Sequence, residues 1–167
     1  VAQGTLQAHY EFQTLVCQLT GMEVANAGMY DGSTALAEAA LMAARVTRRM
    51  KAAVLDSVSP AYVQVLNAFG EAPGLAVERV GADARSLDED TACLIVQQPN
   101  FLGYIEEMER LSELAHSSGA LLVVYADPMS LAMFRPPSDF DADIVVGEGQ
   151  TLGIAPTYGG PYLGIFS

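Results

Sequence analysis

The sequence has few of the residues that reactive sites and polyanionic ligands usually require. Its 167 residues include one lysine, Lys51, two cysteines, two histidines and no tryptophan. Eight basic residues stand against 20 acidic ones, which gives a formal net charge of −12 and would repel a nucleic acid. The apolar runs are too short to span a membrane, and no signal-peptide pattern is visible at the start. We therefore expect neither nucleic acid nor a membrane as a partner.

The cysteines and histidines argue against several kinds of catalytic or metal site. Cys17 and Cys93 lie in separate apolar stretches, so we expect buried free thiols in a reducing cytoplasm. His9 and His116 lack cysteine, histidine or glutamate partners at ligand spacing, so no metal site is predicted. The nucleophile elbow of serine hydrolases and the glycine-rich phosphate loops of nucleotide-binding proteins are absent as well.

What the sequence does contain is an alternation of apolar strands and helices. Because several of the strands are apolar throughout, the pattern is typical of a mainly parallel sheet with helices on both faces. We predict an α/β fold that forms one domain over residues 1–167. The chain stops on an apolar strand, so we expect a central fragment of a longer subunit. The predicted helices span residues 2–20, 34–50, 60–69 and 104–119, and the predicted strands span 52–56, 75–80, 92–97, 120–128 and 142–147, with a last one beginning near 161.

Ligands of open parallel sheets bind at the carboxyl ends of the strands, and the first segment expected there is "YDGST". Backbone N–H groups of Gly32, Ser33 and Thr34, with the two hydroxyls, could hold a phosphate at the start of a helix. Asp31 or Ser33 could equally be an ordinary helix cap, which is the commoner use of this pattern. Asp31 also places a negative charge where an anion would bind.

Two further segments follow buried strands. In "VVYADP", Asp127 could face a metal ion, a hydroxyl or a protonated ring nitrogen, or it could close a strand-ending turn. In "DADIVVGEGQTLG", the turn after the strand offers Glu148 and Gln150 but no lysine, histidine, cysteine or serine. The turn therefore has the place of an active-site turn without a reactive group.

Three long stretches of the sequence resemble one protein family. They are "QGTLQAHYEFQTLVCQLTGMEVANAGMYDGSTALAEAALMA", "QQPNFLGYIEEME" and "YADPMSLAMFRPPSDFDADIVVGEGQTLG", and "YGGPYLGIF" agrees with them. The sequence resembles the glycine decarboxylase P-protein of the glycine cleavage system, and more narrowly subunit 1, the alpha chain of its two-subunit form. The resemblance covers essentially the whole chain, although members of the family are longer on both sides.

The resemblance implies the large domain of the aspartate-aminotransferase-like fold of pyridoxal-phosphate-dependent transferases, with an antiparallel strand near the last segment. It implies decarboxylation of glycine and transfer of the aminomethyl group to the lipoyl arm of the H-protein. It also implies that pyridoxal phosphate is bound by the partner, the catalytic P-protein subunit 2, in a heterotetramer. The Schiff-base lysine of that partner is replaced near Gln150 in this chain. Asp127, Ser33 and Thr34 would then be remnants of a cofactor site, with no catalytic residue and no metal.

Lys51 does not offer a substitute, because it enters a predicted strand at the amino edge, opposite the expected site. We therefore predict the non-catalytic half of an α/β pair. Two alternatives remain open: a self-sufficient lyase or aminotransferase whose lysine lies beyond residue 167, and a detached structural or interaction module. The first helix carries more apolar bulk than one buried stripe needs, so we expect it, and the loop at 28–34, to lie at or near a subunit interface. The side chains behind this prediction are Leu6, Tyr10, Phe12, Leu15 and Val16.

Overall fold

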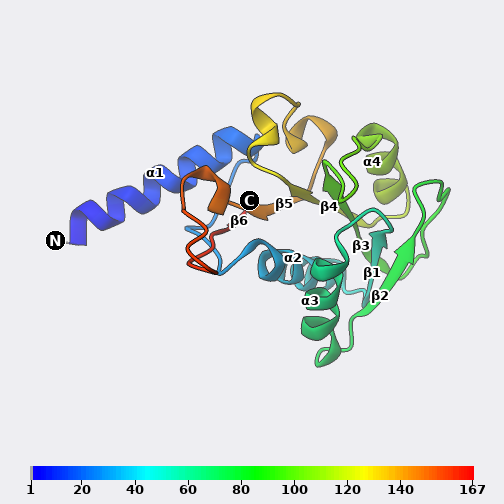
Figure 1. The fold of residues 1–167 in the computed structure, drawn as a ribbon. Helices are drawn as coiled ribbons and strands as arrows, with labels where there is room; N and C mark the ends of the chain where they lie inside the picture. The colour runs from blue at the N-terminus through cyan, green and yellow to red at the C-terminus, as the bar shows by residue number, and fades with distance from the viewer. Residues whose placement is uncertain (1) are drawn as a thin grey trace.

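The computed structural model describes residues 2–167 and contains a six-stranded sheet with the strand order β2-β1-β3-β4-β5-β6 (Figure 1). Strands β1 to β5 pair in parallel, and β6 pairs antiparallel with β5. The predictions of a mainly parallel sheet and of an antiparallel last strand are confirmed. The strands are β1 (Lys51–Leu55), β2 (Ala76–Val80), β3 (Thr91–Gln98), β4 (Leu121–Ala126), β5 (Ile144–Glu148) and β6 (Gly164–Phe166).

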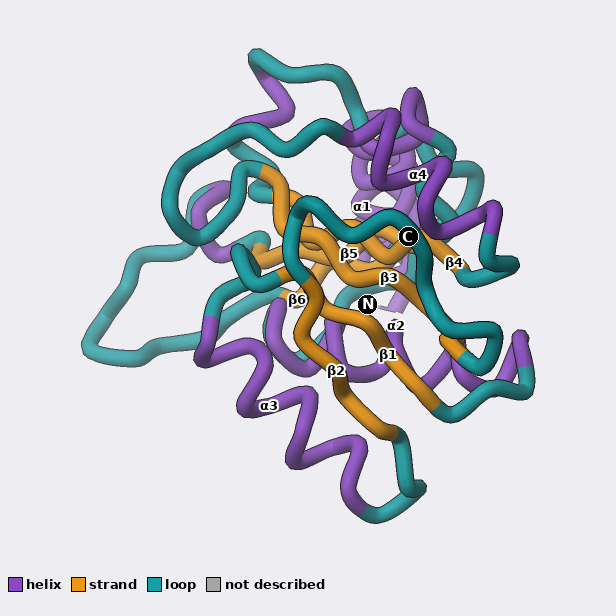
Figure 2. Tube along the Cα trace, turned by 90° about the vertical axis from the view of Figure 1, so that its right-hand side faces the viewer, coloured by secondary structure: helices purple, strands orange, loops and turns teal. Residues whose placement is uncertain are grey.

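Helices cover both faces of the sheet, as the apolar strands predict. Figure 1 and Figure 2 place α4 on one side of the strands and α2 with α3 on the other. Strand β3 is buried from Thr91 to Val96, whereas the edge strand β2 is largely exposed. A strand that is apolar on both sides needs cover on both sides, so the central strands sit in the core and β2 does not. The helices are α1 (Ala2–Thr20), α2 (Gly32–Thr47), α3 (Pro60–Glu71) and α4 (Met108–Ser117), with short 3₁₀ turns at Ser130–Ala132, Pro137–Phe140 and Gln150–Leu152.

One of the two cysteines lies in the core. Cys93 lies in β3 with none of its surface exposed, and burial raises the pKa of its thiol to about 12. A thiol with such a pKa stays protonated at neutral pH and is a poor nucleophile. Cys17 is also free but only half-buried, so the prediction of free thiols is confirmed for both cysteines and that of burial for Cys93 alone.

Helix α1 extends away from the sheet, with the N-terminus at its far end (Figure 1). Leu6, Tyr10 and Leu15 are 55%, 71% and 63% exposed. Phe12 differs from them, because it packs against a small second cluster formed by Val16, Ala25 and Ile165. Part of the apolar bulk of this helix is therefore ordinary core, and part has no cover within residues 2–167.

The predicted and observed helix boundaries differ most at α4, which begins at Met108 rather than at residue 104. The carboxamide oxygen of Asn100 accepts the N–H groups of Leu102 and Tyr104, at 2.9 and 3.0 Å. These side-chain bonds hold the segment in a loop and compete with helix formation. Within residues 2–167, no helix combines the length and apolarity needed to cross a membrane.

Candidate functional site

The candidate site lies at the carboxyl edge of the parallel strands, where α2 begins beside the end of β5. A cavity of about 310 Å³ opens there. Two of the three segments that the sequence points to meet in it, since Asp31 and Ser33 come from the start of α2 and Glu148 ends β5. Tyr62 of α3 and Tyr162 of the loop before β6 complete the lining.

Asp31 caps helix α2. Its carboxylate accepts the N–H of Thr34 and the hydroxyl of Ser33, both at 2.7 Å. The Thr34 hydroxyl in turn accepts the N–H of Asp31, at 3.2 Å, which completes a capping box. Burial alone would raise the pKa of Asp31, but the hydrogen bonds from Thr34 and Ser33 outweigh it and hold the pKa below its ordinary value. Both hydroxyls that could have held a phosphate are thus used by the cap.

Because Gly32 has no side chain, Tyr125 and Glu148 can approach the start of α2 closely. A Cβ atom at this position would lie 2.6 Å from the hydroxyl oxygen of Tyr125 and 3.0 Å from Glu148. Tyr125 packs against Tyr62, with ring centroids 4.6 Å apart and the rings tilted by 37°, and its hydroxyl donates to the Tyr62 hydroxyl at 3.0 Å. Burial, followed by this contact, raises the pKa of Tyr125, so its hydroxyl stays protonated.

Glu148 links three parts of the site. One carboxylate oxygen accepts the N–H of Gly32, and the other accepts the N–H groups of Gln150 and Leu163, all at 2.9 Å. Sequence reasoning noted Glu148 only as a residue of the turn and assigned it no role. The signal that could have found it is the same as for Asp127, namely an acidic residue directly after an apolar strand.

Asp127 lies outside the cavity lining. It is exposed, and its side chain accepts the N–H of Met129 at 3.1 Å, while its carbonyl accepts the hydroxyl of Ser130. These contacts are those of a strand-ending turn, one of the two alternatives that the sequence left open. Its predicted role as a remnant of a cofactor site stays a prediction.

Lys51 stands at the first position of β1, on the amino edge of the sheet, as expected. Its ammonium group contacts Asp88 and pairs with Glu78 at 2.9 Å and with Asp90 at 3.8 Å. The hydrogen bond with Asp88, followed by that with Glu78, raises its pKa above the ordinary value. A lysine that anchors a carbonyl cofactor must lose its proton to react, so this environment opposes that role.

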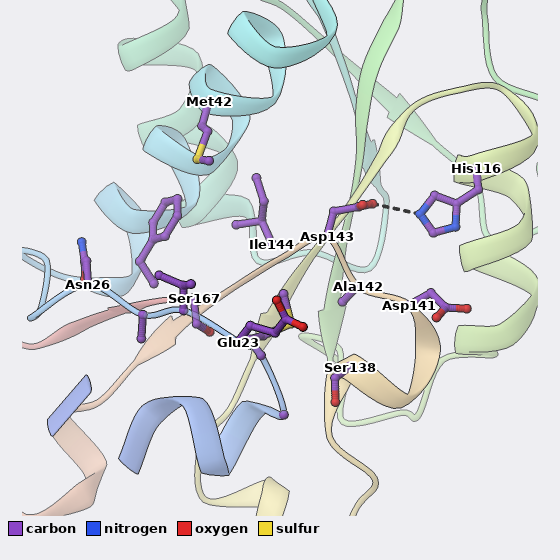
Figure 3. Close-up of a pocket in the computed structure, with 15 residues that line it drawn as sticks. Glu23, Asn26, Met42, His116, Ser138, Asp141, Ala142, Asp143, Ile144 and Ser167 are labelled. Atoms are coloured by element: carbon purple, nitrogen blue, oxygen red, sulfur yellow. Dashed lines mark hydrogen bonds and ion pairs between the residues drawn. The ribbon is translucent and has the colours of Figure 1, made fainter. Parts of the chain in front are cut away.

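A larger cavity, of about 720 Å³, lies where β5 begins and β6 ends, at the amino ends of the parallel strands (Figure 3). Its wall includes His116, whose Nε2 lies 2.9 Å from the Asp143 carboxylate. The same oxygen of Asp143 accepts the N–H of Leu122, and His116 Nδ1 lies 3.3 Å from the hydroxyl of Ser112. Ser112 is only 7% exposed and does not line the cavity. The three side chains therefore tie α4 to β5 and do not form an accessible nucleophile.

No cluster of three or more histidine, cysteine, aspartate or glutamate side chains within residues 2–167 could hold a metal ion. The arrangement that remains is a helix start facing the turn after β5, on a mainly parallel sheet. Solved structures of pyridoxal-phosphate-dependent enzymes have this fold. One solved structure of this fold, an O-acetylhomoserine (thiol)-lyase from Campylobacter jejuni, contains N'-pyridoxyl-lysine-5'-monophosphate. It superposes with a TM-score of 0.66 at 11% identity, over 81% of this chain and 34% of that one, which shows the fold alone.

The chain belongs to the glycine cleavage system P-protein family, whose model matches residues 1–167. It is similar to a glycine dehydrogenase (decarboxylating) subunit 1 from Desulforamulus reducens, at 48% identity over 176 residues. A crystal structure of a glycine decarboxylase (P-protein) in inhibitor-bound form superposes with a TM-score of 0.96 at 44% identity. Both comparisons cover all of this chain, which spans 40% of the length of the first protein and 39% of the second.

Proposed function

We propose that this chain is part of the non-catalytic alpha subunit, subunit 1, of a glycine dehydrogenase (decarboxylating). The observation that carries the proposal is the position of Lys51, the only lysine of a chain that belongs to the P-protein family. It lies on the amino edge of the sheet within a group of acids. In the turn after β5, where the family resemblance implies that the partner carries its Schiff-base lysine, this chain has Gln150.

The complete enzyme would release CO₂ from glycine and pass the aminomethyl group to the lipoylated H-protein. Pyridoxal phosphate, held by the catalytic subunit 2, supplies the electron sink for this cleavage. This chain would pack against that subunit and form a wall of its active site. Asp127, Ser33 and Thr34 would be inherited remnants of a cofactor site.

We also propose that residues 1–167 form one α/β domain and are a central fragment of a longer subunit. The chain covers about 40% of the curated relative, which supports this view. The subunit would act in the cytoplasm, in a heterotetramer with subunit 2. The free thiols of Cys17 and Cys93 are consistent with a reducing compartment.

The proposal is tested by producing the complete subunit with and without its candidate catalytic partner and measuring exchange of labelled CO₂ into glycine. We expect the two subunits to co-purify and to be active only together. Exchange by this subunit alone would favour the self-sufficient enzyme. Failure to co-purify, with no gain in exchange when the two are mixed, would favour a detached module.

A further inference from the structure

Glu148 occupies the position at the start of α2 that an anionic ligand would take. The N–H groups at a helix N-terminus attract anions, because they lack partners within the helix and carry a partial positive charge. Here the Gly32 N–H donates to one Glu148 oxygen, and two further backbone N–H groups, from Gln150 and Leu163, donate to the other. Three backbone donors around one carboxylate are the kind of coordination that a phosphate receives in phosphate-binding loops.

Two other donors of the first turn are also used within the chain. The N–H of Thr34 donates to the Asp31 carboxylate at 2.7 Å, and the N–H of Ala35 donates to the Asp31 carbonyl at 3.0 Å. The backbone N–H of Ser33 also acts on the Asp31 carboxylate and lowers the pKa of that group. The N–H groups of Gly32, Thr34 and Ala35 therefore have acceptors in the chain itself.

The charges and the packing around the start of α2 also oppose the binding of a phosphate group. Asp31 and Glu148 put two carboxylates on a cavity lining that includes no lysine or arginine. Tyr125 fills the space against Gly32 so closely that even a methyl group there would clash. A phosphate group would have to displace Glu148 and then bind beside two negative charges. The residues present do not fit the phosphate of pyridoxal phosphate.

We propose that Glu148 is a built-in anion that closes the start of α2 to phosphate-bearing ligands, pyridoxal phosphate included. It takes the donors that a phosphate would use and supplies the negative charge that the helix end attracts. This assignment concerns the ligand specificity of this chain's own cavity. It holds whether or not the subunit takes part in glycine decarboxylation.

The test is a titration of the complete subunit with inorganic phosphate and with pyridoxal phosphate, followed by calorimetry, in wild type and in Glu148→Ala. The substitution frees three N–H donors and removes one charge. We expect the variant to bind both ligands at least roughly tenfold more tightly than wild type, as charge-assisted hydrogen bonds to phosphate form. Pyridoxal without its phosphate should show no such gain.

The matched control is Glu107→Ala, which removes an exposed carboxylate that pairs with Arg110, at 3.4 Å. It should bind phosphate as wild type does. Equal affinity in wild type and Glu148→Ala, or an equal gain in both variants, would overturn the proposal. If Glu148→Ala does not fold, as judged by circular dichroism, Glu148→Gln takes its place. This variant keeps the size of the side chain and removes the charge, so its phosphate affinity should also exceed that of wild type, and an unchanged affinity would count against the proposal.

Discussion

The site at the start of α2 depends on the close packing at Gly32 as much as on the carboxylates of Asp31 and Glu148. Helix α2, strand β5 and the side chain of Tyr125 meet at this glycine. A Cβ atom there would lie 2.6 Å from the Tyr125 hydroxyl and 3.0 Å from the Glu148 backbone nitrogen. Tyr125 is buried and packs against Tyr62, so it has little room to move. A side chain at position 32 would have to push the helix off the sheet.

Gly32→Ala should therefore destabilise the fold. We expect the free energy of unfolding to fall by about 1–3 kcal/mol, the usual cost of overpacking. Gly4→Ala is the control, because a Cβ atom at Gly4 meets nothing within 4 Å and alanine favours a helix. Denaturant unfolding of the complete subunit measures both. Equal stability of the two variants would contradict the close packing at Gly32.

Asp31 leads to a prediction about pH. Its pKa in the folded chain lies below the ordinary value of 3.8, so its carboxylate stabilises the fold above that pH and loses this effect as the pH falls through the folded pKa. Asp31→Asn keeps a residue that can cap a helix but removes the charge. At pH 7 we expect the variant to be less stable by about 0.5–1 kcal/mol, a value kept small because the group is mostly solvent-screened.

The difference between wild type and Asp31→Asn should shrink below about pH 4, the range in which free aspartate takes up a proton. Glu89→Gln is the control, since it removes one exposed carboxylate elsewhere in the chain. Unfolding measured from pH 7 down to the acid range provides the test. A stability difference that stays constant as the pH falls would refute a role for the Asp31 charge.

Helix α1 carries large apolar side chains that no other part of residues 2–167 covers. Its exposed apolar side chains Leu6, Tyr10 and Leu15 stand outside both hydrophobic clusters. Phe12 belongs to the second cluster, so changing it would mix a packing defect with any effect on association. The interface predicted from the sequence is best tested on the exposed side chains alone.

Leu6→Glu together with Tyr10→Glu should weaken association of the complete subunit with its proposed catalytic partner by at least roughly tenfold, because buried aromatic anchors dominate interface energies. Ala8→Glu is the control, since residue 8 lies on the opposite side of the helix from residues 6 and 10. Light scattering or calorimetry measures the affinity, and circular dichroism checks the fold. An affinity equal to that of the control would leave α1 without a role in this interface.

On the scale of the whole molecule, local sequence predicted the sheet but not the contacts of the site. The apolar runs that form β3, β4 and β5 predicted a parallel sheet covered by helices on both faces. The sequence also predicted that Lys51 lies at the amino edge of this sheet. The hydrogen bond from the Gly32 N–H to Glu148 joins residues 116 positions apart. It depends on how α2 packs against the sheet. No local pattern encodes such a distance. The contact between Tyr62 and Tyr125 could not be predicted for the same reason.

The central claim is that this chain does not anchor the cofactor and that its partner does. The direct measurement is borohydride reduction of the assembled two-subunit enzyme with pyridoxal phosphate, followed by peptide mapping. We predict that the label appears on a lysine of the partner and that Lys51, on the far edge of the sheet among Glu78, Asp88 and Asp90, remains unlabelled. Stoichiometric labelling of Lys51 would contradict the account.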